Sequence, residues 1–418
     1  MIEIKPLDHC DAIVTIPGSK SYTHRAFILS ALADGESILI SGLRSEDTDY
    51  TVQGLMKFGV PISWEGDVAH VFGKGGELRA PAEVIYVGNS GASMRFLTAL
   101  SALKDGRTLL DGSERMRKRP IGDLLDSLQM LGARAYSQEG SGYPPVVVES
   151  KGLAGGIAKI KGEESSQFLS ALLMVAPYSK KDVCLEVTGQ LASKPYVDIT
   201  LDIMSAFGVE VQNEGYHSFL VRAGQSYLPQ KYRIEGDASN ASYFFSAAAV
   251  SRGRLKVRNF NPVSLQGDRG FLDILKKMGC EVILREDGVE VRGRELQGIE
   301  IDMNGMPDLV PTLAITAAFA QGKTVIRNVG HLHLKESDRI QALAVELSKM
   351  GIRVEEGEDW LRIEGGKPHG AEIESYNDHR IAMSFAVAGL VVPRVKIKGE
   401  RCVDKSFPEF WEKLKDLY

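Results

Sequence analysis

Apolar and polar positions along the chain repeat in a regular order. Five times, an amphipathic stretch with helical spacing ends in a bulky apolar residue and a glycine, and a short β-branched run follows. The five stretches are TVQGLMKFGVPISW, IGDLLDSLQMLGARAY, VDITLDIMSAFGVEVQ, RGFLDILKKMGCEVIL and RIQALAVELSKMGIRVEE. A glycine directly after a helical pattern is typical of a helix C-terminus. Each stretch therefore predicts a helix, a glycine stop and a strand.

The stop glycines are evenly spaced. They are Gly59, Gly132, Gly208, Gly279 and Gly351, which lie 73, 76, 71 and 72 residues apart. Such a period is typical of a repeated supersecondary unit that buries its apolar face by packing against its siblings. The C-terminal segment FPEFWEKLKDLY has the pattern of a further helix. Six units are therefore expected.

Each period also contains a second, more apolar stretch rich in alanine and serine. The six stretches are RAFILSALA, MRFLTALSAL, SQFLSALLMVA, ASYFFSAAAV, LVPTLAITAAFA and HRIAMSFAVAGL. Small side chains allow helices to pack closely, so these stretches predict core helices inside a ring of sheets.

The length of 418 residues exceeds what one hydrophobic core usually organises, so two domains of three units each are expected. The polar stretch RAGQSYLPQKYRIEGD is the expected crossing between them. We expect residues 16–229 to form an inserted domain, and residues 1–15 plus 230–418 to form a discontinuous one. By pattern alone the first dozen residues fit either half.

Composition narrows the functional classes. A net charge of −5 gives no general attraction to nucleic acid or to a membrane, so any anion site must be built locally. The N-terminus lacks the pattern of a signal peptide, and no segment has 18 consecutive apolar residues, so we expect a cytoplasmic protein. The four cysteines, Cys10, Cys184, Cys280 and Cys402, form no CxxC pair, which indicates neither a disulfide scaffold nor a zinc site.

Five polar clusters lie directly before apolar helical stretches: PGSKSYTHR, GNSGASMR, EESSQ, EGDASNAS and YNDHR. Helix N-termini favour bound anions, because their backbone N–H groups and positive dipole ends face outward. Eight cations lie in or near such turn-rich segments: Lys20, Arg25, Arg95, Arg119, Lys335, Arg339, Arg380 and Lys405. One such cation is most often a solvated surface charge. Jointly, beside glycine and hydroxyl residues, they predict a site for a multiply charged anion.

Two other motifs are weaker. PGSKS resembles the end of a P-loop, but residues 11–18 lack the earlier glycine that this loop requires, so ATP binding is not expected there. His331 and His333 alternate as metal ligands on a strand would, yet no third ligand is evident. We therefore expect neither a metal nor an organic cofactor.

The segment KESDR places Lys335, Glu336, Asp338 and Arg339 within five residues at a predicted strand-to-helix turn. Crowded acids and bases shift each other's pKa values toward catalytic usefulness. A helix start explains the same residues, with Ser337 or Asp338 as N-cap and Glu336 favouring the dipole. The two interpretations are compatible.

Nine motifs follow one another from residue 17 to residue 408: PGSKSYTHR, GNSGASMR, RMRKRPI, SSQFLSALLM, SKPYVDIT, EGDASNASYF, KESDR, YNDHRIAM and KSFPEF. In this order they resemble the 5-enolpyruvylshikimate-3-phosphate synthase family of enolpyruvyl transferases. The resemblance implies an α/β fold, a two-domain inside-out α/β barrel. Each domain would contain three βαββαβ-type units around a pseudo-threefold axis, with the helices inside. The active site would lie in the interdomain cleft.

The resemblance also implies the reaction. The 5-hydroxyl of shikimate 3-phosphate adds to C2 of phosphoenolpyruvate while C3 is protonated, and the tetrahedral intermediate then loses phosphate to leave an enol ether. This step belongs to the shikimate pathway, which leads to chorismate and the aromatic amino acids, and the family is the target of glyphosate. The implied partners are the two small substrates, without nucleic acid or membrane, and the expected state is a monomer.

Site residues are carried over by position. Those that resemble the family's shikimate 3-phosphate contacts are Lys20, Ser21, Arg25, Ser165, Ser166, Gln167, Ser193, Tyr196, Asp308 and Lys335. Those that match the phosphoenolpyruvate contacts are Lys20, Asn89, Gly91, Arg119, Gln167, Arg339, Arg380 and Lys405. The implied catalytic residues are Asp308 as general base, Glu336 as general acid and Lys20, which would touch both substrates. A lysine is the alternative for one of the proton transfers.

The chain departs from the family pattern at three positions. Ala92 and Phe96 stand where threonine and proline are common, and His331 stands where asparagine is often found. None of these changes removes a charged catalytic group. Two alternatives stay open: a UDP-N-acetylglucosamine enolpyruvyl transferase, which typically has a cysteine acid near RMRKRPI, and a non-catalytic anion-binding relative. No cysteine lies between Cys10 and Cys184.

Overall fold

The helices and strands follow the repeat predicted from the sequence. The computed structural model describes residues 1–418. All five stop glycines have a positive φ, from 79° to 110°, which glycine adopts without steric cost. Each follows a helix and precedes a strand. The predicted order of helix, glycine stop and strand is therefore confirmed.

The chain divides into two compact units. Unit 1 comprises Met1–Pro17 and Glu235–Tyr418, and unit 2 comprises Gly18–Ile234. The sequence pattern places the second crossing five residues earlier. The strand Lys231–Arg233 belongs to unit 2, because Ile38 donates its backbone N–H to the Gln230 carbonyl at 2.8 Å and so starts a parallel ladder there.

Unit 2 alternates helices and strands along the chain. Its helices are α1 Lys20–Leu32, α2 Glu46–Lys57, α3 Gly91–Ser101, α4 Gly122–Met130, α5 Ser166–Val175 and α6 Lys194–Ala206, with short 3₁₀ helices η1 Met116–Lys118 and η2 Ala176–Tyr178. Its strands are β3 Asp34–Ile40, β4 Ile62–Glu65, β5 Val68–Lys74, β6 Ile85–Tyr86, β7 Asp105–Asp111, β8 Arg134–Ser137, β9 Val146–Lys151, β10 Gly156–Lys161, β11 Val183–Thr188, β12 Val211–Glu214, β13 Ser218–Val221 and β14 Lys231–Arg233. They form three sheets, ordered β14-β3-β5-β4, β6-β7-β9-β8 and β10-β11-β13-β12.

Unit 1 is built in the same way. Its helices are α7 Ala238–Ser251, α8 Phe271–Lys277, α9 Val310–Ala318, α10 Arg339–Lys349, α11 His379–Gly389 and α12 Phe410–Lys415, with 3₁₀ helices η3 Gly267–Gly270, η4 Pro307–Leu309, η5 Gly330–Leu334 and η6 Glu400–Lys405. Its strands are β1 Ile2–Ile4, β2 Asp11–Thr15, β15 Arg254–Arg258, β16 Glu281–Arg285, β17 Gly288–Arg292, β18 Glu300–Asp302, β19 Lys323–Arg327, β20 Arg353–Glu356, β21 Trp360–Glu364, β22 Glu372–Glu374 and β23 Val395–Lys398. The sheets are β2-β15-β17-β16, β18-β19-β21-β20 and the three-stranded β1-β23-β22.

The five four-stranded sheets share one pairing pattern, in which one edge pair is parallel and the other two pairs are antiparallel. In β6-β7-β9-β8, the pair β6–β7 is parallel and the pairs β7–β9 and β8–β9 are antiparallel. Parallel strands need a crossover, which α3 supplies, whereas an antiparallel pair can be joined by a short turn. The order along the chain is therefore β-α-β-α-β-β, which differs from the βαββαβ type implied by the resemblance. The class of the fold is mixed α/β, as predicted.

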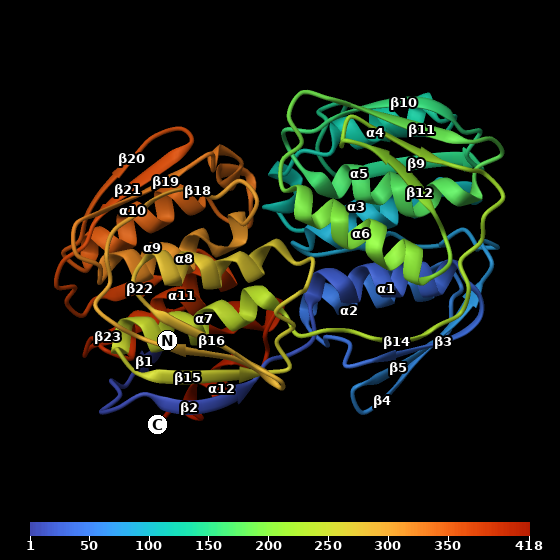
Figure 1. The fold of residues 1–418 in the computed structure, drawn as a ribbon. Helices are drawn as coiled ribbons and strands as arrows, with labels where there is room; N and C mark the ends of the chain where they lie inside the picture. Colours follow the sequence, from blue (N-terminus) through green and yellow to red (C-terminus); the bar gives the residue numbers. More distant parts are fainter. The chain divides into compact units, whose positions relative to one another are not determined.

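The six alanine- and serine-rich stretches form buried helices, as predicted. Every residue of α11 is buried, and so is every residue of α1 from Tyr22 onward. Figure 1 shows the helices of each unit lying against the inner faces of its sheets. Hydroxyl pairs join the helices inside unit 1: Ser246 and Thr316 lie 2.7 Å apart and Ser242 and Thr312 lie 3.2 Å apart. None of the helices is long and apolar enough to span a bilayer.

Strand β1 packs on the end of α11. A methyl group on Gly389 would lie 2.5 Å from Cβ of Ile4 and 2.8 Å from its Cγ2. We therefore expect Gly389→Ala to lower the free energy of unfolding by about 1–3 kcal/mol, the usual cost of overpacking, in a urea titration. Gly305→Ala is the matched control, because no atom lies within 4 Å of its Cβ position. Equal losses in both variants would contradict this packing.

Candidate active site

The five polar clusters form helix N-termini, as predicted. Their N-caps are Ser19, Ser90, Ser165, Asp237 and Asp378, which precede α1, α3, α5, α7 and α11. Each N-cap side chain accepts a hydrogen bond from a backbone N–H two or three residues further on. The caps stabilise the first turns and leave the other N–H groups of those turns facing outward.

Arg25 of α1 contacts α3, α5 and α6 in unit 2. The Arg25 guanidinium donates to the Thr200 hydroxyl at 2.7 Å, to the Tyr196 carbonyl at 3.0 Å and to the Ser170 hydroxyl at 3.2 Å. It also lies over the ring of Phe96, 5.2 Å from the ring centroid. Burial lowers the pKa of Arg25 to about 10, so the side chain stays charged at neutral pH.

A second contact links Lys20 to the start of α3. Lys20 Nζ lies 3.2 Å from a carboxylate oxygen of the buried Asp47. The hydroxyls of Ser90 and Ser93 donate to the Asp47 backbone carbonyl at 3.3 and 3.1 Å. The amino group of Lys20 is therefore held near the positive end of α3, where an anion would meet both.

Gly91 opens α3 between two arginines. Arg119 donates to the Asn89 carbonyl at 3.0 Å and to its side-chain oxygen at 3.3 Å. Arg95 donates to the carbonyls of Gly91 at 3.3 Å and Pro120 at 2.9 Å. A methyl group on Gly91 would lie 2.7 Å from Nη2 of Arg119 and 3.0 Å from Nη1 of Arg95. Only glycine leaves both guanidinium groups in place.

The remaining unit 2 candidates lie on two further helix starts. Ser166 and Gln167 form the first turn of α5, and the Gln167 N–H donates to the Ser165 hydroxyl at 3.2 Å. Ser193 precedes α6 with a φ of 54°, a left-handed conformation that is uncommon for serine. Tyr196 follows one turn later and donates its N–H to the Ser193 carbonyl at 3.0 Å.

Arg339 organises the candidates in unit 1. It is 1% exposed and donates to three carboxylates: Asp378 at 2.8 and 3.2 Å, Asp308 at 2.9 Å and Glu336 at 3.0 Å. Burial by itself would lower the pKa of Arg339, but Asp378, Glu336 and Asp308 outweigh burial and raise it. One buried cation thus gathers side chains from three separate segments of the chain.

Asp308 bridges two arginines. Its Oδ1 accepts from Arg339 at 2.9 Å and its Oδ2 accepts from Arg380 at 2.8 Å, while Arg380 also donates to the Tyr243 hydroxyl at 3.3 Å. Burial would raise the pKa of Asp308, but Arg380, Arg339 and Lys335 hold it well below its ordinary value. Asp308 is therefore a carboxylate at neutral pH.

Glu336 lies between Arg339 and Lys405. Its Oε2 accepts from Arg339, and its Oε1 lies 4.0 Å from Lys405 Nζ. Asp338 is the N-cap of α10 and accepts from the Gln341 N–H at 3.1 Å, so the helix-start interpretation of KESDR is confirmed. The segment serves as a helix start and as a crowded charge cluster at once.

The predicted strand around His331 and His333 is wrong. Residues Gly330–Leu334 form the 3₁₀ helix η5, because Asn328 with a φ of 59° turns the chain away from β19. His333 lies 2.8 Å from an Asp338 oxygen and 3.1 Å from the Glu358 carbonyl. Burial, together with Lys335, lowers the pKa of His331 to about 3, so its ring is neutral.

Two acidic residues of these charge clusters were missed by the sequence analysis: Asp378 in unit 1 and Asp47 in unit 2. Asp378 is fully buried, caps α11 and accepts from both Ser337 and Arg339. Its place in YNDHR, directly before an apolar helix, was a signal that could have identified it. Asp47 carries no such signal, because it lies inside the polar turn of α2 and meets Lys20 only in the folded chain.

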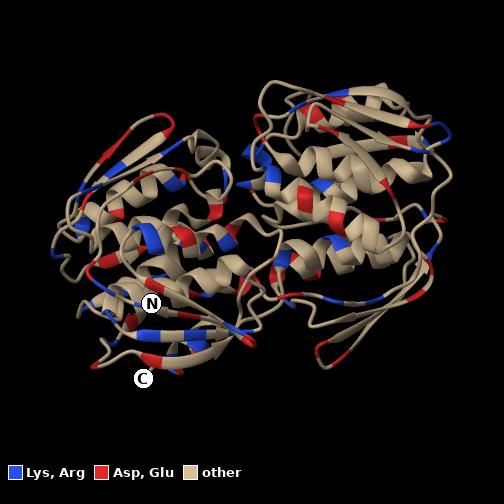
Figure 2. Cartoon of the chain, viewed as in Figure 1, with Lys and Arg blue, Asp and Glu red and all other residues tan.

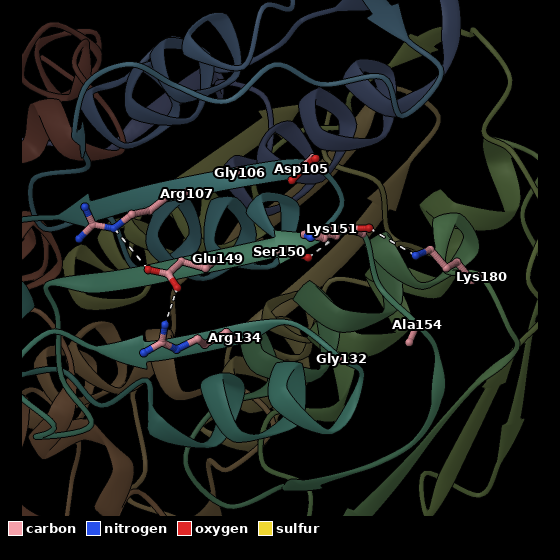
Figure 3. Close-up of a pocket in the computed structure, with 11 residues that line it drawn as sticks. Asp105, Gly106, Arg107, Gly132, Arg134, Glu149, Ser150, Lys151, Ala154 and Lys180 are labelled. Carbon is pink, nitrogen blue, oxygen red and sulfur yellow. Dashed lines mark hydrogen bonds and ion pairs between the residues drawn. The ribbon is translucent and has the colours of Figure 1, made fainter.

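A surface hollow in unit 2 lies apart from these residues. It has a volume of about 570 Å³ and lies over β7, β8 and β9. Arg107 and Arg134 both point to Glu149, at 3.7 and 2.8 Å (Figure 3). Both arginines that line it are thus engaged with a neighbouring acid, and Lys180 donates to the Lys151 carbonyl at 3.4 Å. Figure 2 shows Lys and Arg positions interspersed with Asp and Glu positions along the chain.

The fold and these clusters define the class of protein. A mixed α/β scaffold that presents lysines, arginines and buried carboxylates at helix N-termini is typical of an enzyme for anionic substrates. A family model described as EPSP synthase (3-phosphoshikimate 1-carboxyvinyltransferase) matches residues 4–414. The chain belongs to this family. The family and the transferase class predicted from the motifs are confirmed.

Individual relatives agree along the whole chain. A 3-phosphoshikimate 1-carboxyvinyltransferase of Nostoc punctiforme is 48% identical over 417 residues, which cover 99% of this chain and 98% of that protein. The enzyme of the same name from Salmonella arizonae is 43% identical, with the same coverage. The solved EPSP synthase of Acinetobacter baumannii superimposes with a TM-score of 0.84 at 30% identity, covering 99% of this chain and 97% of that one.

The Arg339 network is expected to dominate the stability of unit 1. Removing one partner of a buried ion pair costs about 3–5 kcal/mol, because charged groups are left buried without compensation. We therefore expect Arg339→Gln to lower the free energy of unfolding by about this amount at pH 7. Arg353→Gln is the control, since that side chain is 72% exposed and should cost less than about 1 kcal/mol.

The same pair of variants has a predicted pH dependence. A depressed carboxyl pKa such as that of Asp308 contributes stability above the unfolded value near pH 4, and this contribution is lost as pH falls through the folded value. The stability gap between wild type and Arg339→Gln should therefore narrow as pH falls below about 4. A gap independent of pH in denaturant titrations would contradict the assigned charges.

Proposed function

We propose that this chain transfers the enolpyruvyl group of phosphoenolpyruvate to the 5-hydroxyl of shikimate 3-phosphate and releases phosphate. Family membership supports the reaction, and the observation that carries it in this chain is the Asp308–Arg339–Glu336 arrangement. In this arrangement, one buried guanidinium holds both the ionised Asp308, which can accept a proton, and a second carboxyl group, that of Glu336. A protein that only bound anions would not need either acid.

Shikimate 3-phosphate is proposed to use the helix starts around Arg25. The contacts are assigned to Lys20, Ser21, Arg25, Ser165, Ser166, Gln167, Ser193, Tyr196, Asp308 and Lys335. The contacts of Arg25 with α5 and α6 support this assignment, since hydroxyls, helix N–H groups and a buried arginine suit a phosphate and a carboxylate. Phe96 under the Arg25 guanidinium would limit its movement.

Phosphoenolpyruvate is proposed to bind Lys20, Asn89, Gly91, Arg119, Gln167, Arg339, Arg380 and Lys405. The close approach of Arg119 and Arg95 to Gly91 supports this, because it presents forked donors where no side chain intervenes. The assigned residues come from both units, so the proposal requires both to supply ligands to one substrate. It also follows the family's interdomain active site and pseudo-threefold barrel architecture.

Asp308 is proposed as the general base and Glu336 as the general acid, with Lys20 as the third catalytic residue. Asp308 would take the proton of the 5-hydroxyl while the hydroxyl oxygen bonds to C2 of phosphoenolpyruvate, and Glu336 would deliver a proton to C3. Collapse of the tetrahedral intermediate then breaks the C2–O bond to phosphate and removes a proton from C3. Positioned proton transfers of this kind contribute about 10²- to 10⁴-fold.

The low pKa of Asp308 makes it a weak base while both arginines face it. Arg339 and Arg380 are among the residues assigned to phosphoenolpyruvate. When a substrate anion draws on these guanidinium groups, it offsets part of the positive charge that stabilises the Asp308 carboxylate. The pKa of Asp308 would then rise, so that the base gains strength when the donor is bound.

The remaining proposals follow the resemblance. We assign a monomeric cytoplasmic enzyme of the shikimate pathway that works without a cofactor. UDP-N-acetylglucosamine is disfavoured as acceptor, because the loop at RMRKRPI lacks the cysteine acid typical of that transferase.

Phosphate release tests the reaction directly. With phosphoenolpyruvate and shikimate 3-phosphate together, we expect stoichiometric phosphate and an enol ether product that mass spectrometry detects. With UDP-N-acetylglucosamine or with no acceptor, release should stay at background. Phosphate release with UDP-N-acetylglucosamine, or a failure to release phosphate with either acceptor, would refute the proposed function.

The acid and the base are tested by isosteric variants. We expect Glu336→Gln and Asp308→Asn to lower kcat by about 10²- to 10⁴-fold, because each removes a proton carrier while keeping its size. Asp308→Asn also places an amide group against an arginine, so its effect on KM should be the larger. Glu364→Gln, an exposed acid in unit 1, is the control. Near-normal turnover in both site variants would contradict the assignment of Asp308 as the base and Glu336 as the acid.

A further inference from the structure

Asp268 is a buried carboxyl group beside the candidate base that no assigned role accounts for. It lies in η3, is 5% exposed and accepts a short hydrogen bond on Oδ2 from the Ser239 hydroxyl. Its other oxygen, Oδ1, is buried without a hydrogen-bond partner. A buried acceptor left in this way is uncommon and calls for an explanation in terms of charge.

The segment that carries Asp268 is anchored on two sides. On one side, Gln266 accepts from the Ala238 N–H at 3.0 Å and donates to Glu235 at 2.7 Å, which fixes the segment against the start of α7. On the other side, a methyl group on Gly270 would lie 2.7 Å from the sulfur of Met306, two residues before Asp308. Asp268 is therefore held between α7 and the turn that presents the base.

The charged groups around Asp268 come from three elements. Asp308 in η4 and Asp237 at the start of α7 repel a charge on it, while Arg380 in α11 attracts one. On its own 3₁₀ helix, Arg269 is directed away, to the Pro262 carbonyl at 3.0 Å. Burial, reinforced by Asp308, raises the pKa of Asp268 to about 7 against the opposing effects of Arg380 and Ser239. The environment thus shifts the pKa values of two neighbouring acids in opposite directions, so that Asp308 is ionised while Asp268 is protonated below neutral pH.

We propose that Asp268 is a positioning residue whose own charge state sets how strongly Arg380 is available to Asp308 and to a bound substrate anion. When Asp268 is a neutral acid, Arg380 can pair with Asp308 and with the anionic phosphoenolpyruvate. When Asp268 is an anion, it competes for Arg380 and repels the Asp308 carboxylate, so the binding of phosphoenolpyruvate weakens. The proposal rests on the proposed function, because it takes Arg380 as a phosphoenolpyruvate contact.

The test is the pH profile of the KM for phosphoenolpyruvate between pH 6 and 8.5. We expect the ratio of wild-type KM to Asp268→Asn KM to rise by about 3- to 10-fold across this range, since a coupling of one pKa unit corresponds to tenfold in binding. The ratio removes the titration of the substrate itself. Asp416→Asn, an exposed acid of unit 1, should follow the wild type throughout. An Asp268→Asn profile parallel to the wild type would overturn the proposal.

A second variant separates charge from structure. Ser239→Ala removes the hydrogen bond that favours the Asp268 anion, so the inflection in KM should move to higher pH. A role limited to packing would lower the melting temperature without moving the inflection, and that result would also overturn the proposal. If neither the wild type nor any variant releases phosphate with shikimate 3-phosphate at any pH, it is the proposed function that fails.

A stability measurement tests the charge without turnover. Because the folded pKa of Asp268 lies above its unfolded value near 4, its ionisation costs stability as pH rises from about 4 to 7. The melting temperature of Asp268→Asn relative to wild type should therefore increase over this interval. A constant difference would mean that Asp268 does not titrate there and would overturn the proposal.

Discussion

The buried guanidinium of Arg339 is the interaction on which the candidate site of unit 1 depends. It is almost fully enclosed and forms ion pairs with carboxylates from three segments, at Asp308, Glu336 and Asp378. Without it these acids would repel one another in a region of low dielectric. The fold thereby obtains two acids at fixed positions near a third that caps α11. A site for anionic substrates and the integrity of this part of the core rest on one side chain.

The opposing requirement is that the site has free capacity for a substrate anion. In unit 2, helices whose N-caps satisfy only some of the first-turn N–H groups pack around the buried Arg25, which contacts α5 and α6. Gly91 adds space, because any side chain there would displace Arg119. Charge and shape are thus set by backbone geometry more than by side chains that could relax.

Repetition explains how such sites arise from short local signals. The five four-stranded sheets have the same pairing pattern, and each of the six inner helices follows a strand at the edge of a sheet. The same position in successive repeats is therefore a helix N-terminus, and five of these six helices begin with a Ser or Asp cap. Helix α9 is the exception: it follows η4, which carries Asp308, and its N-cap Leu309 has no capping side chain.

Local pattern determined most of the secondary structure. The stop glycines, the six core helices and the helix-start clusters depend on residues within one or two turns of each other, and all were found where the sequence indicated. The strand expected at His331 failed, because alternation over four residues does not distinguish a strand from the 3₁₀ helix that a left-handed Asn328 introduces. The motifs also determined the family.

Only the tertiary structure decided which charges meet. Nothing near Arg339 in the sequence reveals that it binds Asp378, and nothing near Lys20 points to Asp47, because these pairs join residues 39 and 27 positions apart. The same holds for the pKa values. Asp308 and Asp268 are both aspartates in short 3₁₀ turns, yet two arginines lower the pKa of one and burial raises that of the other. Ionisation depends on distance and solvation in three dimensions, which a linear pattern does not contain.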